Sequence, residues 1–302
     1  MSSLHISPRA NHFSPFEKFL LRMKPSRRMH LFDSMAISDF VSLASASSLL
    51  KEITDIYKDT AWKIDDFFSM WFNTSLEFRC MLAFTGAIVS GSQAIRFLDR
   101  MEPAASSDLD ILTRVGGVLS LVNYLEGQGY HRVEKKPGRK EDYPLLADIF
   151  ALSSTAQFCK GGGKNGILEI FDFKKRLFRA IRGVDRLKVQ ISVVAQNPIH
   201  HMLFSYHSTA VMNYVSHDEA VSVFPLSTFV KRVSYPSTRL GLGREWNPSW
   251  KAKYEAKGFR FDIKSLRPAV VLGRRFVKDR CCWVLPHGGE HVHRPNPMKF
   301  PS

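Results

Sequence analysis

Residues 88–100 read IVSGSQAIRFLDR. The apolar start of this stretch predicts a strand that ends in a tight turn, and the remainder predicts a short helix over residues 92–100. Ser92 is suited to cap that helix, which leaves backbone N–H groups at its start able to hold a phosphate. Gly91 lets the backbone come close to such a ligand because it carries no side chain. The stretch therefore predicts a phosphate-binding turn.

A pair of carboxylates follows this turn. Residues 106–114 read SSDLDILTR, and their alternation predicts a strand. Asp108 and Asp110 are two residues apart, so both project from one face, whereas Leu109 and Ile111 project from the other face into the core. Mg²⁺ prefers oxygen ligands, usually one or two carboxylates together with substrate phosphates. A phosphate turn beside a carboxylate pair predicts a metal–nucleotide site.

These motifs resemble the nucleotidyltransferase superfamily, which has a DNA polymerase beta-like fold. Its signature is a Gly-Ser at a strand–helix turn followed by an acidic-x-acidic pair on the next strand. Gly91, Ser92, Asp108 and Asp110 match that signature in order. The segments SGSQAIRFLDR, SDLDI and FSYHSTAVMN are also similar to a group of fungal proteins with a nucleotidyltransferase-like core. The resemblance covers residues 84–235, about half of the chain.

The resemblance implies an α+β fold with a mixed-sheet core that transfers a nucleotide from a nucleoside triphosphate to an acceptor, with Mg²⁺ as cofactor. The carboxylate pair would bind the metal, and the Gly-Ser turn would hold phosphates. The FSYHSTAVMN segment would lie near the nucleotide, so that Thr209 or Asn213 contacts the base or the sugar. A packing role for these two side chains is the alternative.

The superfamily takes a third carboxylate from a later strand, and the alternation of residues 187–194 predicts that strand. Gln190 stands where the acid is expected. Its amide can bind a metal or nucleotide through the carbonyl oxygen but cannot act as a base. Asp172, on the preceding strand, is the candidate substitute in catalysis. If the connecting hairpin turns near Ile181, Asp172 and Gln190 lie opposite each other on one face, whereas a one-residue slip would separate them.

The chain divides into four predicted regions: a mostly disordered tail over 1–29, a helical region over 30–83, the core over 84–235, and a C-terminal extension with a loose tail over 236–302. Within the tail, residues 16–23 favour a short helix that stops before Pro25. The helical region is faintly similar to an F-box but lacks its Leu-Pro opening. It is either a packing buttress or an adaptor for a protein partner. Two functions therefore stay open: nucleotidyl transfer, or a catalytically inactive protein that binds nucleotide or a protein partner.

The 302-residue chain is strongly basic, with 43 Lys and Arg against 28 Asp and Glu, and a formal net charge of +15. This balance favours an anionic partner such as a nucleoside triphosphate or a nucleic acid. The densest basic cluster, residues 174–186, lies in a predicted hairpin beside the site. It is either a nucleic-acid footprint or a solvated face.

Four cysteines without a disulfide framework indicate a reducing, intracellular compartment, cytoplasmic or nuclear. No apolar run approaches the roughly 20 residues that span a bilayer, so we expect no membrane partner. The Arg-, Lys- and Ser-rich residues 1–31 leave a mitochondrial transit peptide as a minor alternative.

Two other clusters give weaker sequence evidence for a functional site. Cys281 and Cys282 are adjacent and lack the C-x-x-C spacing of a zinc site, and the segment that follows predicts an apolar strand. Residues 161–164 read GGGK but lack the GxxxxGK[ST] spacing of a phosphate loop. Neither cluster competes with the Gly-Ser turn as a predicted site.

Overall fold

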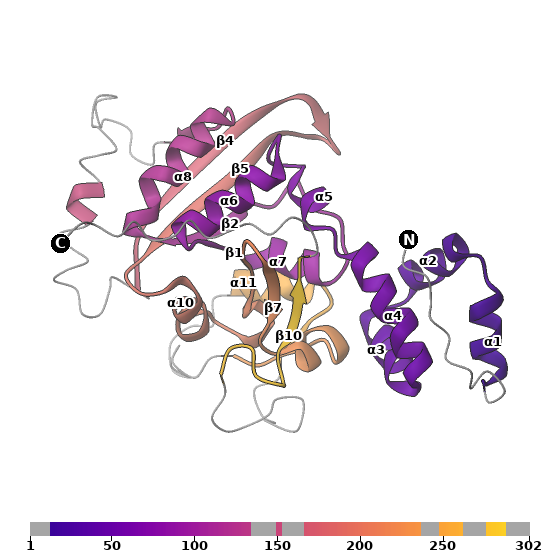
Figure 1. Ribbon diagram of the computed structural model, residues 1–302. Helices are drawn as coiled ribbons and strands as arrows, with labels where there is room; N and C mark the ends of the chain where they lie inside the picture. Colours follow the sequence, from indigo (N-terminus) through magenta and orange to yellow (C-terminus); the bar gives the residue numbers. More distant parts are fainter. Residues whose placement is uncertain (1–12, 134–148, 153–165, 237–247, 262–275, 288–302) are drawn as a thin grey trace, which may run out of the picture. The chain divides into compact units, whose positions relative to one another are not determined.

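The computed structural model describes residues 13–133, 149–152, 166–236, 248–261 and 276–287 (Figure 1). The chain forms two compact units, Met1–Ala61 and Trp62–Ser302. In the described ranges, no helix is long and apolar enough to cross a membrane. The glycine-rich residues 161–164 lie outside the described residues.

The first unit is built from short helices. They are α1 (Pro15–Arg22), α2 (Pro25–Ser34), α3 (Ile37–Ala46) and α4 (Ser48–Ala61). Ser14 and Glu17 form a capping box at the start of α1, in which each side chain accepts a hydrogen bond from the other residue's backbone N–H. The rings of Phe32, Phe40 and Tyr57 pack with centroids 5.2 to 6.0 Å apart. The short helix predicted over 16–23 is confirmed as α1, whereas α2 begins within residues predicted to be disordered.

Among the described residues, an eight-stranded mixed sheet forms the centre of the second unit, in the order β10-β7-β6-β1-β2-β5-β4-β3. β2 and β5 are parallel, and the other neighbouring pairs are antiparallel. The strands are β1 (Ile88–Ser90), β2 (Leu109–Arg114), β3 (His131–Val133), β4 (Ile167–Ile181), β5 (Val184–Val194), β6 (Asn213–Val215), β7 (Glu219–Ser222) and β10 (Trp283–Pro286). A separate parallel pair joins β8 (Val233–Ser234) and β9 (Arg260–Phe261).

Helices surround this sheet. They are α5 (Ile64–Phe68), α6 (Ser75–Thr85), α7 (Gly91–Leu98), α8 (Val115–Gly127), α10 (Pro198–Ser205) and α11 (Pro248–Glu255), with a 3₁₀ turn at Thr209–Val211 and a π-helical turn at Leu226–Val230. The predicted mixed α/β architecture is confirmed at this level, including a strand that carries Asp110, with Asp108 just ahead of it, and the helix that follows.

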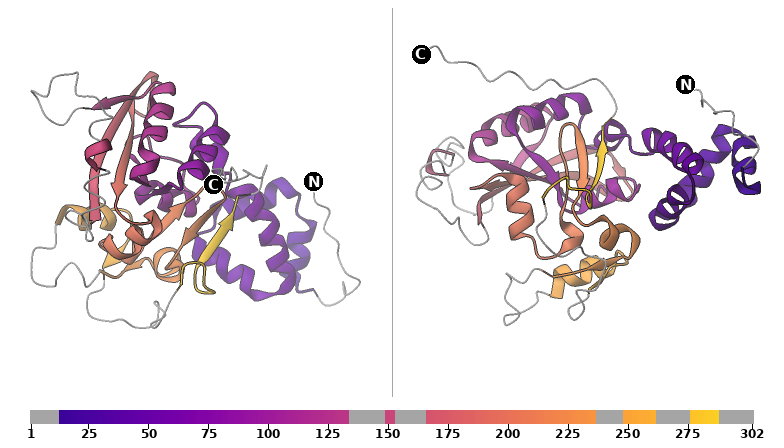
Figure 2. Two further views of the ribbon diagram at one scale, coloured as in Figure 1. Left: turned by 60° about the vertical axis from the view of Figure 1, so that its left-hand side comes forward. Right: turned by 60° about the horizontal axis from the view of Figure 1, so that its bottom comes forward.

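The two faces of the sheet meet different helices. Alternation along β2 sends Leu112 to one face and Leu109 and Ile111 to the other. Leu112 and Val194 pack in one hydrophobic cluster with Met202 of α10. α8 contacts β2 and β5 and lies on the side of the sheet away from α10 (Figure 2, right). The even-numbered residues of β2, which include the second carboxylate of the predicted pair, thus share the face of α10.

The predicted domain limits need two corrections. The helical region predicted over 30–83 is divided between the units, because α5 and α6 belong to the second one. The region beyond residue 235, predicted as an extension, takes part in the sheet: β10 pairs with β7, and the Trp283 ring packs edge-on against Trp62 and Phe229. The last predicted residues, 288–302, lie outside the described part of the chain.

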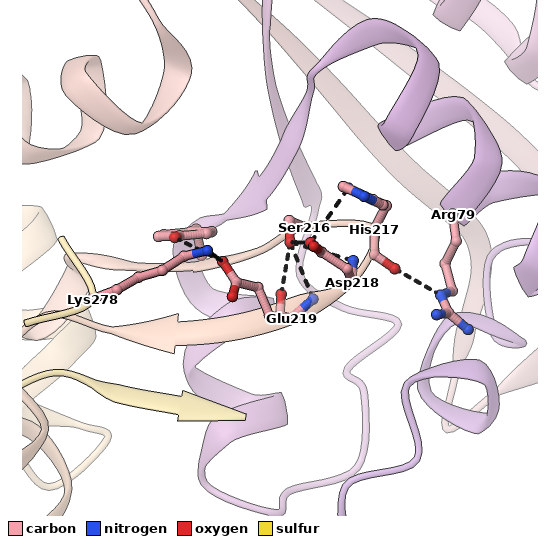
Figure 3. Close-up of polar contacts among 7 residues, drawn as sticks. Arg79, Ser216, His217, Asp218, Glu219 and Lys278 are labelled. Carbon is pink, nitrogen blue, oxygen red and sulfur yellow. Dashed lines mark hydrogen bonds and ion pairs between the residues drawn. The ribbon is translucent and has the colours of Figure 1, made fainter. Parts of the chain in front are cut away.

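The turn between β6 and β7 lies at the end of the sheet away from the predicted carboxylates, and its polar groups are paired (Figure 3). Arg79 of α6 is 3% exposed and donates its Nε to the carbonyl oxygen of His217 at 3.0 Å. It also pairs with Asp65 at 3.3 Å. Lys278 Nζ pairs with Glu219 at 2.6 Å. These contacts tie α6 and the segment before β10 to the turn.

Candidate functional site

Asp110 lies against the Gly91 turn. Ser90, the last residue of β1, stands opposite Asp110 in the antiparallel register with β2. Gly91 has a φ of +70°, a conformation that favours glycine. A Cβ built on Gly91 would stand 2.1 Å from Oδ2 of Asp110. A side chain at position 91 would force the Asp110 carboxylate to move, and the positive φ also favours glycine here.

The carboxyl group of Asp110 is poorly solvated. The residue retains some exposure, but burial of its carboxyl group raises the pKa to about 7, and the charge of Asp108 adds to the rise. The positive charges of Lys253 and Lys257 partly oppose it. A carboxylate in this position gains from a nearby cation. Sequence reasoning did not include the two lysines.

Gln190 and Asp172 extend the row of polar side chains across the sheet. Asp110 pairs with Gln190 in the parallel β2–β5 register, and Gln190 pairs with Asp172 in the antiparallel β4–β5 register. Residues paired in register share a face, so the three side chains form a line. Gln190 Nε2 donates to Asp172 Oδ1 at 2.7 Å. Of the two registers that the sequence left open, the structure has the one in which Asp172 and Gln190 lie opposite each other, and Gln190 stands between Asp172 and Asp110.

The hairpin that sets this register turns close to the predicted position. Arg182 and Gly183 have φ values of 48° and 81°, as in the two-residue turns that suit the twist of a hairpin. Ile181 and Val184 flank them as a pair. An irregularity in the pairing between Arg176 and Ile181 accommodates the extra residues of β4. Asp172 and Gln190 therefore stay in register although the turn lies slightly beyond Ile181.

Ser92 does not cap α7. The helix begins at Gly91 with Ser90 as its N-cap, and Ser92 is 2% exposed. The Ser90 hydroxyl instead shares a hydrogen bond of 2.5 Å with the Tyr206 hydroxyl. Burial raises the pKa of Tyr206, and the charge of Asp110 adds to the rise. The predicted cap is wrong, but the first N–H groups of α7 still lack acceptors within the helix.

α11 and the residues after it bring cations to the site. The His207 ring stacks on Trp250 with centroids 3.9 Å apart and contacts Tyr254 at 5.6 Å. Lys257 Nζ lies 5.3 Å from the centre of the Tyr254 ring. In the described part of the structure this ammonium group is buried without a hydrogen-bond partner. Burial, and then the positive charge of Lys253, lowers the pKa of Lys257 to about 8.

Gln93 holds the loop that leads into β2. Its side chain is fully buried. Nε2 donates to the carbonyl oxygens of Ala104 and Ser107 at 2.9 and 3.1 Å, and Oε1 accepts from the Ala104 N–H at 3.3 Å. These three bonds fix the backbone just ahead of Asp108. Sequence reasoning missed this role because an amide on a short helix carries no motif.

The two residues predicted to contact the base or sugar form hydrogen bonds within the protein. Thr209 Oγ1 accepts from the Tyr235 N–H at 3.0 Å. Asn213 is fully buried, and its Nδ2 donates to the Ala210 carbonyl oxygen at 2.7 Å. Both therefore hold the segment after α10 in place. Their contacts favour the packing alternative over contact with a nucleotide.

The carboxylates do not gather into a group of three. Among the described residues, no cluster of three or more His, Cys, Asp or Glu side chains is arranged to hold a metal ion. Asp108 and Asp110 remain a pair, with Asp172 further along the row. The strand predicted at Cys282 and the residues after it is β10, Trp283–Pro286.

Known proteins give no guide to the role of this site. The chain matches no family model, no curated protein and no solved structure. What the site does must be inferred from its own residues.

Proposed function

We propose that this protein has a nucleotidyltransferase-like core, binds a nucleoside triphosphate with Mg²⁺ at Asp108 and Asp110, and transfers the nucleotidyl group to an acceptor. The observation that carries the proposal is the contact between Gly91 and Asp110, where a Cβ would stand 2.1 Å from Oδ2. A backbone turn that starts a helix lies directly against a poorly solvated carboxylate. Phosphate and metal are the ligands that these two features bind.

The phosphates are proposed to lie between the start of α7 and the lysines beyond it. Backbone N–H groups at a helix start attract anions, and Gly91 adds no side chain that would block them. Lys257 carries a buried ammonium group without a hydrogen-bond partner among the described residues. A phosphate would supply that partner. Its negative charge would also raise the pKa of Lys257, which burial lowers to about 8. Lys253 provides a second positive charge nearby.

Asp108 and Asp110 fit a magnesium ion. Two carboxylates with substrate phosphates form a ligand set that Mg²⁺ accepts, and the amide oxygen of Gln190 is a further candidate ligand. The charge of Asp108 raises the pKa of Asp110, so a bound cation would relieve repulsion between the two. When bound, Mg²⁺ would offset the negative charge on the phosphates that are cleaved.

Asp172 is proposed as the base. The acceptor hydroxyl oxygen would form a bond to the α-phosphorus, the bond from that phosphorus to the oxygen bridging to the β-phosphorus would break, and pyrophosphate would leave. The hydroxyl proton would pass to a carboxylate oxygen of Asp172, which lies beyond Gln190 in the row. The bond from Gln190 at 2.7 Å orients this carboxylate. Positioning and charge stabilisation would supply most of the rate.

A second candidate is a protein that binds nucleotide and has lost the chemistry. It is favoured by one observation: Gln190 separates Asp172 from Asp110, and the described residues hold no cluster of three acids. The helices of the first unit would then serve a protein partner. The two candidates differ in turnover and agree on nucleotide binding.

Pyrophosphate release with each nucleoside triphosphate and a pool of hydroxyl acceptors tests the transfer. Asp172→Asn keeps an oxygen that can accept from Gln190 but removes the base, so we expect kcat to fall about a hundredfold or more at unchanged nucleotide affinity. Asp108→Ala with Asp110→Ala should abolish binding and release together. Binding without any release in the wild type would favour the second candidate, and full activity of Asp172→Asn would remove Asp172 as the base.

A further inference from the structure

β4 and β5 continue beyond the rest of the sheet as a two-stranded ribbon. β2 pairs with β5 only from Val189 onwards, and β3 pairs with β4 only up to Lys174. Residues 175–188 therefore project past the strands that flank them (Figure 1). The projection starts at the end of the sheet where Asp110 lies. The ribbon is thus continuous with the row of site side chains.

One face of the ribbon is basic. Asp172 pairs with Gln190, Lys174 with Lys188, and Arg176 with Arg186. These positions alternate along both strands, so the two basic pairs share the face of Asp172 and Gln190. The row that begins at the carboxylates therefore continues outward as four cations.

These cations are paired with each other across the strands. Like charges directly opposite on an antiparallel pair repel and destabilise it. Lys188, Arg176 and Arg186 are exposed, and Lys174 is partly so. In the described part of the chain, Arg186 has the exposed neighbour Asp185 at 3.6 Å, whereas Lys174, Arg176 and Lys188 form no ion pair. A ligand with regularly spaced negative charges would remove this repulsion.

An aromatic ring stands near the tip of the same ribbon. Phe178 is 100% exposed, more than any other large hydrophobic side chain described. It follows Arg176 by two residues, within the irregular part of the pairing. A fully exposed ring in the open gains nothing from folding, because it stays in water in both states. Its surface is available to stack on a flat partner.

We propose that this basic face binds single-stranded nucleic acid and guides its end to the carboxylates. Phosphates would lie between the two cation pairs, and a base would stack on Phe178. Proteins that bind single strands combine these two elements, a positive track along the backbone and aromatic rings under the bases. The inference rests on the proposed function only for the destination of the strand, which would supply the acceptor hydroxyl.

The continuity with the site favours nucleic acid over an anionic membrane. A strand end must reach Asp110 to be an acceptor, and the row of cations leads there. A membrane surface would meet a single aromatic ring at the tip, and stable membrane attachment takes more than one weak signal. Anionic vesicles nevertheless enter the test as an arm of their own.

The test is anisotropy of a labelled single-stranded RNA or DNA oligonucleotide with the full chain, without nucleotide or Mg²⁺. Arg176→Gln with Arg186→Gln should weaken binding at least tenfold at low salt. It should also make the slope of log K against log salt shallower by about 1.4, which is 0.7 for each phosphate that is no longer neutralised. Lys231→Gln with Arg280→Gln removes the same charge from exposed positions outside the ribbon and should leave affinity within about twofold.

Phe178 gives an independent arm. Phe178→Ala should weaken binding about tenfold with an unchanged salt slope, and Phe178→Tyr should retain wild-type affinity because its ring still stacks. Phe178 is fully exposed, so neither substitution should affect folding. No salt-dependent binding by the wild type, equal losses in the ribbon and control variants, or binding to phosphatidylserine vesicles but not to the strand would each overturn the proposal. Strand binding without nucleotidyl transfer would leave it standing and count against the proposed function alone.

Discussion

The two ends of the central sheet handle charge in opposite ways. At the β6–β7 turn, Arg79 is held by Asp65 and by the His217 carbonyl oxygen, and Lys278 is held by Glu219 (Figure 3). At the other end, Asp110 and Lys257 are both poorly solvated. Neither forms an ion pair or a side-chain hydrogen bond within the described structure.

We infer that the charges with partners at the β6–β7 turn stabilise the fold, whereas those without partners at the other end bind a ligand. Removing one partner of a buried charge leaves polar groups unpaired and destabilises the fold, whereas a buried charge without partners already costs stability, which an external ligand can recover. The like-charged pairs of the ribbon are exposed or partly exposed, and a ligand would relieve their mutual repulsion rather than a burial cost. If this distinction between the two ends of the sheet is correct, substitutions at Arg79 and at Asp110 should change the free energy of unfolding with opposite signs.

The largest effect is expected at Arg79. Arg79→Met keeps the length of the buried side chain but removes the donor to His217, so we expect a loss of about 2–3 kcal/mol in the free energy of unfolding. Urea denaturation at pH 7 measures it. Asp65→Asn is the matched control and should cost less than about 1 kcal/mol, because Asp65 is 49% exposed. A neutral Arg79→Met would mean that the turn is not held by this charge.

A smaller effect of opposite sign is expected at Asp110. Its pKa of about 7 lies above the unfolded value of 3.8, so the folded state prefers the protonated form. This preference contributes stability fully below pH 3.8 and loses it as pH rises through 7. Asp110→Asn mimics the protonated form, so in the absence of metal it should stabilise the protein at pH 8 by about 1–2 kcal/mol, a value reduced for partial exposure.

Denaturant titrations of wild type and Asp110→Asn across pH 5–8 measure this effect. The two stabilities should converge as the pH falls. Asp185→Asn, at an exposed position on the ribbon, should show no such pH dependence. A destabilising Asp110→Asn at pH 8 would place Asp110 with the charges that hold the fold.

Local sequence patterns predicted the positions of many of the residues in this site. Alternation placed Asp110 and Gln190 on their strands, and the Gly91 turn was recognisable because a glycine follows a short apolar strand. The structure gives this glycine a positive φ close to Asp110. The pairing of Asp172 with Gln190 depended on a hairpin length that the sequence indicated closely enough. Each of these inferences uses neighbours within one strand or one turn.

The other features of the site depend on contacts between segments far apart in the sequence, and local patterns did not predict them. Lys257 reaches the site because His207 stacks on Trp250, a contact between segments with no shared motif. Ser92 resembles a cap in sequence, but the strand ends one residue earlier and Ser90 takes that position. β10 was predicted as a strand without a partner, because nothing in its four residues indicates that it adds to β7.

The central claim is that Asp108 and Asp110 form a metal–nucleotide site, and thermal unfolding with nucleotide tests it most directly. A nucleoside triphosphate with Mg²⁺ at ten times its Kd should stabilise the wild type by about 1.4 kcal/mol by mass action, and a chelator should remove most of that gain. Asp108→Ala with Asp110→Ala should fold and show no gain. Absence of stabilisation in the wild type at millimolar nucleotide, or an equal gain in the double variant, would contradict the account.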